Sequence, residues 1–299
     1  MSEHWTNYWQ QGHLTSFGGG FKTNYEGELK HFWQRFADNI EEHSTILDIG
    51  TGNGALIEIL QTNHNFKCIG VDKALINKDY INSVNGEILS GVSAEQLPFK
   101  NGQFDHVISQ FAIEYTNVNK SIEEVYRVLK SKNNFVFICH HPESVIIKSN
   151  QEILDTSIKI KSKLIAHLDN VAKALVEGRN DLIKNNFEFI DAFIFENWGN
   201  LNGLKGSNLL AFVDFLKRNQ GKEVNFVKAL ELFKKELELL ILRLQELINA
   251  ADNLSVIVNK LKESEIELEL GHIREDKSAA LLACFMYAKT AQHKCTIES

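Results

Sequence analysis

Three alternating glycines directly after a short apolar run constrain the fold of this chain more than any other feature. Residues 45–49 have the apolar positions of a buried parallel strand, and Gly50, Gly52 and Gly54 follow at once. Residues 55–60 are apolar at positions that suit a helix packed on a sheet. The sequence therefore predicts a strand, a tight glycine turn and a helix N-terminus whose free N–H groups can bind a polar ligand.

A second apolar run, residues 68–71, ends at Asp72, about one strand–helix–strand unit later. A carboxylate there can accept hydrogen bonds from both hydroxyls of a ribose, and we expect Asp72 to be exposed at the sheet edge. With Ala55 the glycines also satisfy the dinucleotide pattern G-x-G-x-x-G/A, which is weak on its own. Asp48 precedes the turn, where a carboxylate would repel a pyrophosphate but suits an ammonium and a sulfonium. These residues predict a nucleoside-containing ligand.

Three segments resemble known methyltransferase motifs. Residues 48–54, Asp-Ile-Gly-Thr-Gly-Asn-Gly, resemble the first motif of class I S-adenosylmethionine (AdoMet)-dependent methyltransferases, and Asp72 is similar to the acid that closes their second strand. Residues 93–99 resemble the segment Asp-Ala-Glu-x-Leu-Pro-Phe of the methyltransferase type 11 family, with Ser93 in place of the aspartate. Residues 124–130, Glu-Val-Tyr-Arg-Val-Leu-Lys, are similar to that family's helix Glu-x-x-Arg-Val-Leu-Lys.

The resemblance implies an α/β fold: a Rossmann-like class I methyltransferase sheet, parallel with an antiparallel final strand. The first, second, fourth and fifth strands are expected near residues 45–49, 68–72, 104–110 and 135–139, and the final pair near 266–270 and 279–289. The resemblance places the third strand next to the motif at 93–99. The family's Pro-Gly-Gly turn is Ser-Lys-Asn-Asn at 131–134, and asparagine tolerates the left-handed conformation that this turn needs. The AdoMet-binding domain is therefore expected to comprise residues 1–143 and 264–299.

The segment between these two parts, residues 144–263, is expected to be an α-helical insertion, or cap, between strands 5 and 6. Leucine, isoleucine, lysine and glutamate dominate it, and heptad seams run over residues 154–175 and 226–247. We expect two long helices, joined by a loop at 199–206, to pack as an antiparallel pair. The alternative is a coiled coil between two chains, so the sequence predicts a monomer or a homodimer through this insertion.

The N-terminal segment, residues 1–41, is expected to form an aromatic lid followed by a helix. Residues 1–36 carry three of the four tryptophans, and hydrophobic side chains recur at helical spacing over 25–41. Gly18–Gly20, between two phenylalanines, has the composition of a hinge. A lid here would exclude water from the cofactor and place rings near its sulfonium. A permanent aromatic patch on the domain surface is the alternative.

The resemblance also implies which residues hold AdoMet. The glycines are assigned to its methionine end, the acid to its ribose, residues 93 and 94 to its adenine, and residues 110 and 111 to the opposite wall, while the stem of Lys73 covers the adenine. Because Ser93 is shorter than the family's aspartate, the backbone of Ala94 is expected to carry the adenine contact. The expected cofactor-binding residues are Asp48, Gly50, Gly52, Gly54, Asp72, Lys73, Ser93, Ala94, Gln110 and Phe111.

Four residues near strand ends are candidates for catalysis: His140, His141, Glu114 and Tyr115. Oxygen or nitrogen acceptors can require a base, and the two histidines end the fifth strand, whose carboxyl end faces the ligand. The alternative is that each histidine is a structural turn residue. No metal site is expected from the sequence.

Composition limits the function. The net charge is −7 without an arginine-rich stretch, which argues against a nucleic-acid substrate. No membrane-length apolar run, signal peptide or paired cysteines are evident, so we expect a cytoplasmic protein without a membrane partner. The predicted function is AdoMet-dependent methyl transfer to a small-molecule acceptor. An NAD(P)-dependent oxidoreductase and a non-catalytic scaffold with the AdoMet fold are the alternatives.

Overall fold

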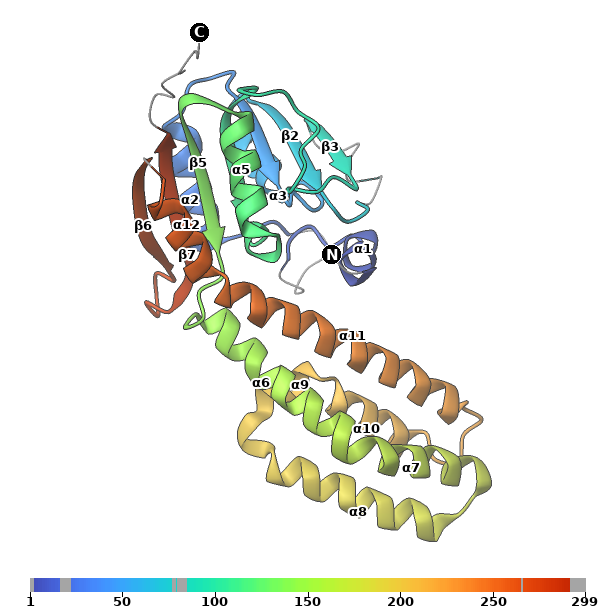
Figure 1. Ribbon diagram of the computed structural model, residues 1–299. Coiled ribbons are helices and arrows are strands. Elements are labelled where there is room, and N and C mark those ends of the chain that lie inside the picture. Colours follow the sequence, from blue (N-terminus) through green and yellow to red (C-terminus); the bar gives the residue numbers. More distant parts are fainter. Residues whose placement is uncertain (1–2, 17–22, 77–78, 80–84, 265, 291–299) are drawn as a thin grey trace. The chain divides into compact units, whose positions relative to one another are not determined.

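The computed structural model describes residues 3–16, 23–76, 79, 85–264 and 266–290 (Figure 1). The chain divides into two compact units, one formed by residues 1–145 with 249–299 and the other by residues 146–248. We describe each unit by itself. The predicted glycine hinge, Gly18–Gly20, lies outside the described residues.

The first unit contains a seven-stranded sheet with the order β3-β2-β1-β4-β5-β7-β6. Its strands are β1 Thr45–Ile49, β2 Lys67–Asp72, β3 Glu87–Ser90, β4 Phe104–Gln110, β5 Leu129–Cys139, β6 Ile266–Arg274 and β7 Leu281–Thr290. The pairs among β1 to β5 are parallel, and β7 is antiparallel to both β5 and β6. The predicted fold class, a Rossmann-like sheet with an antiparallel final strand, is confirmed.

Helices cover both faces of this sheet. The described helical elements of this unit are α1 Glu3–Gln10, α2 Gly27–Asp38, α3 Ala55–Leu60, the 3-10 turn η1 Ile113–Tyr115, α5 Val118–Val128 and α12 Leu254–Lys262. α5 and α12 share one hydrophobic core with Leu47 and Val107 of the sheet. Phe36 of α2 contacts His106, the neighbour of Val107 in β4, and therefore packs on the opposite face.

The second unit is helical. Its elements are α6 Val145–Lys159, a π turn η2 Ile160–Leu164, α7 Ile165–Glu177, α8 Asn180–Glu196, η3 Trp198–Asn200, α9 Leu201–Gly206, α10 Leu209–Arg218 and α11 Phe226–Asp252, and the unit boundaries fall within α6 and α11. Both predicted seams lie in one core together with side chains of α8 and α10, such as Ile190 and Leu216. Side chains of α6, α7, α8, α9, α10 and α11 therefore share the core that was expected of a pair of helices.

Two local expectations for the insertion differ from the structure. The expected loop at 199–206 is η3 followed by α9, because Asn200 caps α9 by accepting a hydrogen bond from the N–H of Gly203. α12, which the sequence analysis placed in the insertion, contributes Leu254, Ile257 and Leu261 to the core of the sheet unit. Its apolar spacing alone could not reveal which core it joins.

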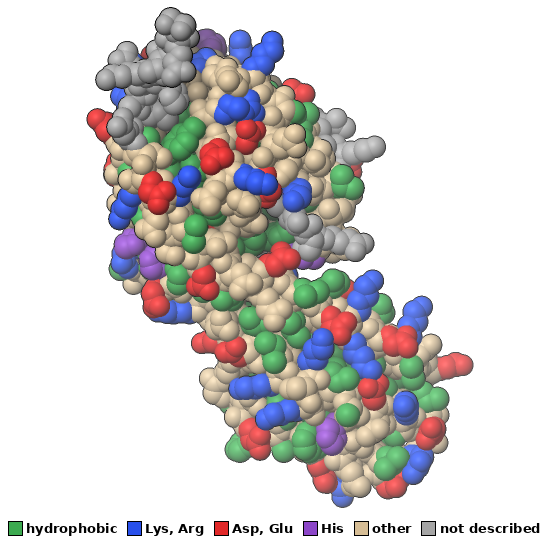
Figure 2. Space-filling view, viewed as in Figure 1, with side chains coloured by type: hydrophobic (Ala, Val, Ile, Leu, Met, Phe, Trp, Pro, Cys, Tyr) green, Lys and Arg blue, Asp and Glu red, His purple; other side chains and the backbone are tan. Residues whose placement is uncertain are grey.

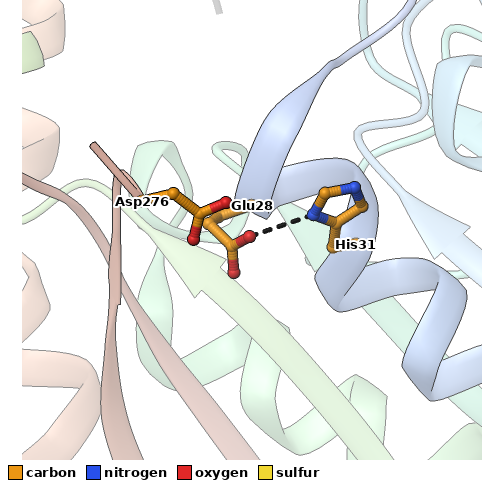
Figure 3. A group of neighbouring side chains, drawn as sticks. All are labelled: Glu28, His31 and Asp276. Atoms are coloured by element: carbon orange, nitrogen blue, oxygen red, sulfur yellow. Dashed lines mark hydrogen bonds and ion pairs between the residues drawn. The ribbon is translucent and has the colours of Figure 1, made fainter. Parts of the chain in front are cut away.

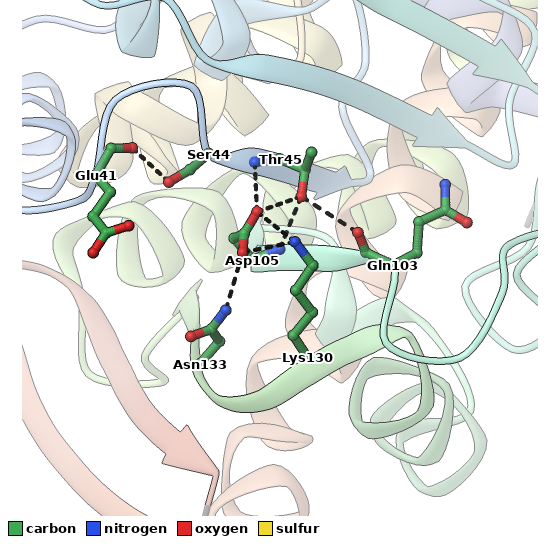
Figure 4. A network of polar contacts seen from close by, with 7 residues as sticks. All are labelled: Glu41, Ser44, Thr45, Gln103, Asp105, Lys130 and Asn133. Atoms are coloured by element: carbon green, nitrogen blue, oxygen red, sulfur yellow. Dashed lines mark hydrogen bonds and ion pairs between the residues drawn. The ribbon is translucent and has the colours of Figure 1, made fainter.

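The amino-terminal edge of the sheet carries a polar network around Asp105 (Figure 4). Its carboxylate accepts hydrogen bonds from the N–H and hydroxyl of Thr45, at 3.0 and 2.6 Å, and from Lys130 Nζ at 2.9 Å. Burial raises the pKa of Asp105, but these hydrogen bonds outweigh it and lower the pKa to about 2. The turn expected at residues 131–134 lies within β5, where its pairing with β4 is irregular. The left-handed residue there is Lys132, with φ 67°, so the expectation that an asparagine takes this conformation is wrong.

None of the described helices combines the length and the apolar character needed to cross a lipid bilayer. On the face of the molecule shown in Figure 2, basic and acidic side chains are intermingled, and neither sign gathers over one element.

Candidate cofactor site and active site

Two cavities adjoin at the carboxyl ends of β1, β2 and β4, within the sheet unit. They share Gly50, Asp72, Ala112 and Tyr115. The first cavity is also lined by Trp5, Trp9, Leu14, Ser16, Tyr25, Thr51, Ala55, Leu56, Gln110 and Phe111. The second is also lined by Ile49, Val71, Lys73, Val92, Ser93, Ala94, Glu95 and Thr116. Seven of the ten expected cofactor-binding residues thus lie around one continuous region.

The three other expected residues, Asp48, Gly52 and Gly54, line neither cavity. Gly50 has φ 75°, and a Cβ there would lie 2.1 Å from Cβ of Ala112, so only glycine fits. Gly54 forms the N-cap of α3 in the left-handed conformation. These glycines shape the turn, and Gly50 alone among them contacts the cavities.

Asp72 is buried, with 5% of its surface exposed, so the expectation of an exposed acid is wrong. Its Oδ2 accepts a hydrogen bond from the Gly52 N–H at 3.0 Å, and its Oδ1 accepts one from the Ala74 N–H at 2.8 Å. Burial raises its pKa to about 6, although both N–H groups act in the opposite direction. Asp72 therefore ties the glycine turn to the loop after β2 as well as lining both cavities.

Asp48 is 1% exposed and lies next to Thr51, which lines the first cavity. Neither of its carboxylate oxygens has a hydrogen-bond partner among the described residues. Burial raises its pKa to about 7, the nearby Thr51 hydroxyl acts in the opposite direction, and the neighbouring charge of Asp72 raises the pKa further. A buried carboxylate without a partner is costly, which marks Asp48 as a group that awaits a cationic or donor-bearing ligand.

Two further polar atoms beside the first cavity lack partners among the described residues, Thr51 Oγ1 and Gln110 Nε2. The side-chain oxygen of Gln110 accepts a hydrogen bond from Trp33 Nε1 at 2.7 Å, and the Gln110 side chain also lies close enough to the Tyr25 hydroxyl to lower its pKa against the effect of burial. Together with Asp48 the cavity therefore offers acceptors for an ammonium and donors for a carboxylate. This donor set fits the zwitterionic methionine end of AdoMet.

The N-terminal helix α1 forms one wall of the first cavity. Trp5 and Trp9 are stacked, with ring centroids 5.9 Å apart, and a Cβ on Gly52 would lie 2.7 Å from the Trp9 ring. Asn53 of the glycine turn is fully buried and donates to the carbonyls of Trp9 and His13, at 3.1 and 2.7 Å. Gln10 donates to the carbonyls of residues 75 and 76 after β2. The described part of the N-terminal segment is thus held against both ligand-facing loops, and its mobility stays a prediction.

The sequence analysis did not identify Asn53, Tyr25 or Ser16 as site residues. Tyr25 precedes α2 and lines the first cavity, where its hydroxyl lies 3.1 Å from the hydroxyl of Ser16. Burial raises its pKa. Asn53 has a sequence signal, because an asparagine within a glycine turn can bond to backbone groups, whereas nothing local in the sequence placed Tyr25 beside this turn.

Of the four candidates for catalysis, Tyr115 lines the cavities and the other three residues do not. Tyr115 lines both cavities, and its ring meets Trp5 edge to face at 5.8 Å. Glu114 and His140 form a buried pair, with His140 Nδ1 2.9 Å from Glu114 Oε1, and neither residue lines a cavity. His141 also lies outside both cavity linings, and its ring contacts that of His272.

The Glu114–His140 pair supports Phe111, which lines the first cavity. The rings of Phe111 and His140 stack with centroids 4.2 Å apart. Phe111 has φ 54°, a left-handed conformation that is strained for a bulky residue. Its N–H donates to the Ile138 carbonyl at 2.8 Å, so β5 and His140 together hold this strained residue at the cavity wall.

The lining of the second cavity includes the polar residues Ser93 and Glu95, which follow β3. Ser93 Oγ accepts a hydrogen bond from the Glu95 N–H at 3.3 Å, so the hydroxyl that replaces the family's aspartate stabilises its own turn. The N–H of Val92 donates to the Asp72 carbonyl at 3.0 Å. The segment that follows β3 is thereby fixed to the residue expected to bind ribose.

One group of three potential metal ligands is found among the described residues: Glu28, His31 and Asp276 (Figure 3). His31 and Glu28 are one turn apart in α2 and 2.9 Å apart at Nδ1 and Oε1, while Asp276 comes from the β6–β7 turn. None of the three lines either cavity. We make no metal assignment to this exposed group.

Comparison with known sequences identifies the central part of the sheet unit. Residues 47–137 match the family model described as a methyltransferase domain. The uncharacterized methyltransferase YcgJ of Bacillus subtilis (strain 168) is 31% identical over 132 residues, which is 41% of this chain and 51% of that protein. The uncharacterized protein MJ1252 of Methanocaldococcus jannaschii is 28% identical over 169 residues, 52% of this chain and 65% of that protein.

A third relative is the ubiquinone/menaquinone biosynthesis C-methyltransferase UbiE of Rickettsia typhi, 30% identical over 113 residues, 31% of this chain and 43% of that protein. The chain therefore spans less than two thirds of the length of each of these relatives. Among solved structures, the PH0226 protein from Pyrococcus horikoshii OT3 is 22% identical, with 43% of this chain and 62% of that chain covered and a TM-score of 0.35.

Proposed function

We propose that the chain binds AdoMet in the two adjoining cavities and transfers its methyl group to a small molecule, because residues 47–137 match the model of a methyltransferase domain. The observation that carries this proposal is the buried Asp48 carboxylate, which has no hydrogen-bond partner among the described residues and lies next to Thr51 of the first cavity. AdoMet, when bound, supplies a methyl group activated by a sulfonium.

In this proposal the first cavity takes the methionine end of the ligand. Asp48 accepts from its ammonium, and Gln110 Nε2 donates to its carboxylate. Neither group makes a hydrogen bond of ordinary geometry within the part of the chain that the structure describes, although Thr51 lies near Asp48 and Tyr25 near Gln110. The second cavity takes the adenosine half, with Asp72 accepting from the ribose hydroxyls and Ala94 beside the adenine.

The acceptor is proposed to meet the methyl group on the aromatic side of the first cavity. Trp5, Trp9 and Tyr115 surround it with ring faces and edges, which exclude water and can stabilise a cationic sulfur. Methyl transfer is an in-line displacement, so alignment of acceptor, methyl carbon and sulfur contributes much of the rate. Tyr115 lines both cavities and is the proposed acceptor contact, whereas His140 acts through Phe111.

Two alternatives remain distinct from this proposal. An NAD(P)-dependent oxidoreductase would place a pyrophosphate beside Asp48 and Asp72, two buried carboxylates that disfavour it. A non-catalytic scaffold would keep the cofactor site without turnover. The helical insertion is proposed to shape the acceptor pocket, and a cytoplasmic location and a monomeric or homodimeric state are proposed with it.

Incubation with radiolabelled AdoMet tests the proposal. We expect label from the methyl group to appear in the small-molecule fraction of a cell extract in the presence of the protein. Label in protein or nucleic acid would contradict the proposed acceptor class. Tight AdoMet binding without any transfer would favour the scaffold.

A further inference from the structure

The helix segment 124–130 resembles a family motif, yet none of its residues lines either cavity. We propose that two of its residues, Glu124 and Arg127, form a clamp that positions the adenosine wall of the second cavity. This inference rests on the proposed function, because it concerns the same ligand. Both residues are positioning residues, since they act through the loop that they hold.

Arg127 contacts the loop between β3 and β4 at three points. Its Nη2 donates to the carbonyl of Leu97 at 3.0 Å, and its Nη1 donates to the carbonyl of Phe99 at 2.7 Å and to Oδ1 of Asn101 at 3.1 Å. The N–H of Gly102 donates in return to the Arg127 carbonyl at 2.9 Å. One side chain at the end of α5 thus satisfies the backbone of a loop that has no strand or helix hydrogen bonds of its own.

Glu124, one turn earlier in α5, completes the clamp. Its Oε1 and Oε2 accept from Arg127 Nε and Nη2 at 2.6 and 2.7 Å, a bidentate pair. Its Oε2 also accepts from the N–H of Leu97 at 2.6 Å. Hydrogen bonds from Arg127 and from Leu97 hold the pKa of Glu124 below its ordinary value, so the carboxylate remains charged at neutral pH. The N–H and the carbonyl of Leu97 are both bound by the clamp.

The clamped residues directly follow the adenosine wall. Ser93, Ala94 and Glu95 line the second cavity, and Leu97 lies two residues further along the chain. At its other end this segment is fixed through the Val92 N–H on the Asp72 carbonyl. Between these two attachments the backbone of Ala94, the expected adenine contact, has little freedom to move. The Asn117 N–H also donates to Oε1 of Glu95 at 3.0 Å. Loss of the clamp would therefore release one of the three attachments that set the position of this segment.

The consequence for binding is a change in the population of the ordered loop. If the loop adopts its binding conformation only about a tenth of the time without the clamp, the apparent affinity falls about tenfold. This loss falls on the adenosine half of the ligand, because the clamped segment, residues 92–95, lines the second cavity and not the first. Adenosine itself is therefore a suitable probe of the clamp.

The test compares Arg127→Met and Arg127→Lys with Lys130→Met as a matched control. Lys130 lies three residues further on and donates to both oxygens of Asp105 at 2.9 Å, so its removal also disrupts a charged network (Figure 4). That network lies at the amino-terminal ends of the strands, away from the cavities. Calorimetric titration measures S-adenosylhomocysteine and adenosine binding, and hydrogen exchange measures the amides of residues 92–101. Arg127→Lys keeps the charge but lacks the planar fork that reaches several carbonyls.

We expect Arg127→Met to weaken both ligands by about tenfold, with faster exchange at residues 92–101. Arg127→Lys should fall between this variant and wild type, and Lys130→Met should retain both affinities. Unchanged affinities in Arg127→Met, or an equal loss in Lys130→Met, would overturn the clamp. Wild-type protein that binds neither ligand would instead contradict the proposed function, and unchanged exchange in Arg127→Met would still overturn the clamp in that case.

Discussion

Replacing Asp48 by asparagine should have opposite effects on stability and on ligand binding. It should raise the free energy of unfolding, because a buried charge is removed, and lower the affinity for AdoMet, because the proposed contact is lost. Asparagine has nearly the same shape but no charge, and the Asp48 side chain is buried without a partner among the described residues. Burial raises the pKa from 3.8 to about 7. A raised folded-state pKa means that the folded protein holds a proton which the unfolded chain has lost, so the free energy of unfolding falls as the pH rises between these two values.

The size of the expected change in the free energy of unfolding follows from the same pKa shift of Asp48. Each pKa unit corresponds to about 1.4 kcal/mol, and relaxation around the site reduces the full value, so we expect about 2–4 kcal/mol. Asp48→Asn should therefore be more stable than wild type by this amount at about pH 8 and equally stable at about pH 3.5, below both pKa values. Urea denaturation at the two pH values measures the difference.

Asp105→Asn is the matched control, since hydrogen bonds lower the pKa of Asp105 to about 2 despite partial burial. The stability that Asp105 contributes is present above its unfolded-state pKa and is lost as the pH falls, so Asp105→Asn should be less stable than wild type at about pH 8. At about pH 8 we therefore expect Asp48→Asn to raise the free energy of unfolding and Asp105→Asn to lower it. A destabilised Asp48→Asn would refute the argument that this carboxylate is buried at a cost.

The same substitution should weaken AdoMet binding. A hydrogen bond to a charged group contributes about 1.5–3 kcal/mol, so the affinity should fall by about 10- to 150-fold. Wild-type affinity should rise with pH up to about 7 as Asp48 loses its proton, whereas Asp48→Asn should keep only the weaker dependence that Asp72 contributes below about pH 6. AdoMet affinity that Asp48→Asn retains in full would refute the assigned contact.

Three further predictions concern the surroundings of the site. Asn53→Ala removes two hydrogen bonds to the end of α1, so the amides of residues 3–16 should exchange faster and S-adenosylhomocysteine should dissociate faster; unchanged exchange would contradict the anchoring role. His140→Gln should lower kcat by less than about tenfold, because a lost general base costs about 10²–10⁴-fold; a loss in that larger range would make His140 a base. Replacing residues 146–248 by a short linker should preserve AdoMet binding and abolish transfer, and retained transfer would exclude a role of this unit in the acceptor pocket.

The local parts of the fold could be predicted from the sequence. The first strand, its glycine turn and the following helix depend on neighbouring residues, and the structure has them at Thr45–Ile49, Gly50–Gly54 and Ala55–Leu60. The buried faces of the helical unit could be predicted for a similar reason, because heptad spacing of apolar residues indicates which face of a helix is buried. Heptad spacing does not indicate how many helices share the core, so the contribution of α8 and α10 was not predicted.

The surroundings of the site could not be predicted, because they depend on contacts between distant segments. Asp72 is buried since it accepts hydrogen bonds from Gly52 and Ala74, and its position at a strand end indicated only that it faces the ligand. Trp9 reaches Gly52 across more than forty residues of sequence, and Asn53 holds it there. The histidines at the end of β5 were placed correctly along the chain, but the buried pairing of His140 with Glu114 required the folded structure.

The central claim is that the glycine turn and Asp72 hold AdoMet. Calorimetric titration of AdoMet and of NAD into wild type and Asp72→Asn tests it most directly. We predict that wild type binds AdoMet at one site and does not bind NAD, and that Asp72→Asn, which keeps one acceptor for the ribose, binds AdoMet about tenfold more weakly. Wild-type protein that binds NAD but not AdoMet would contradict the claim.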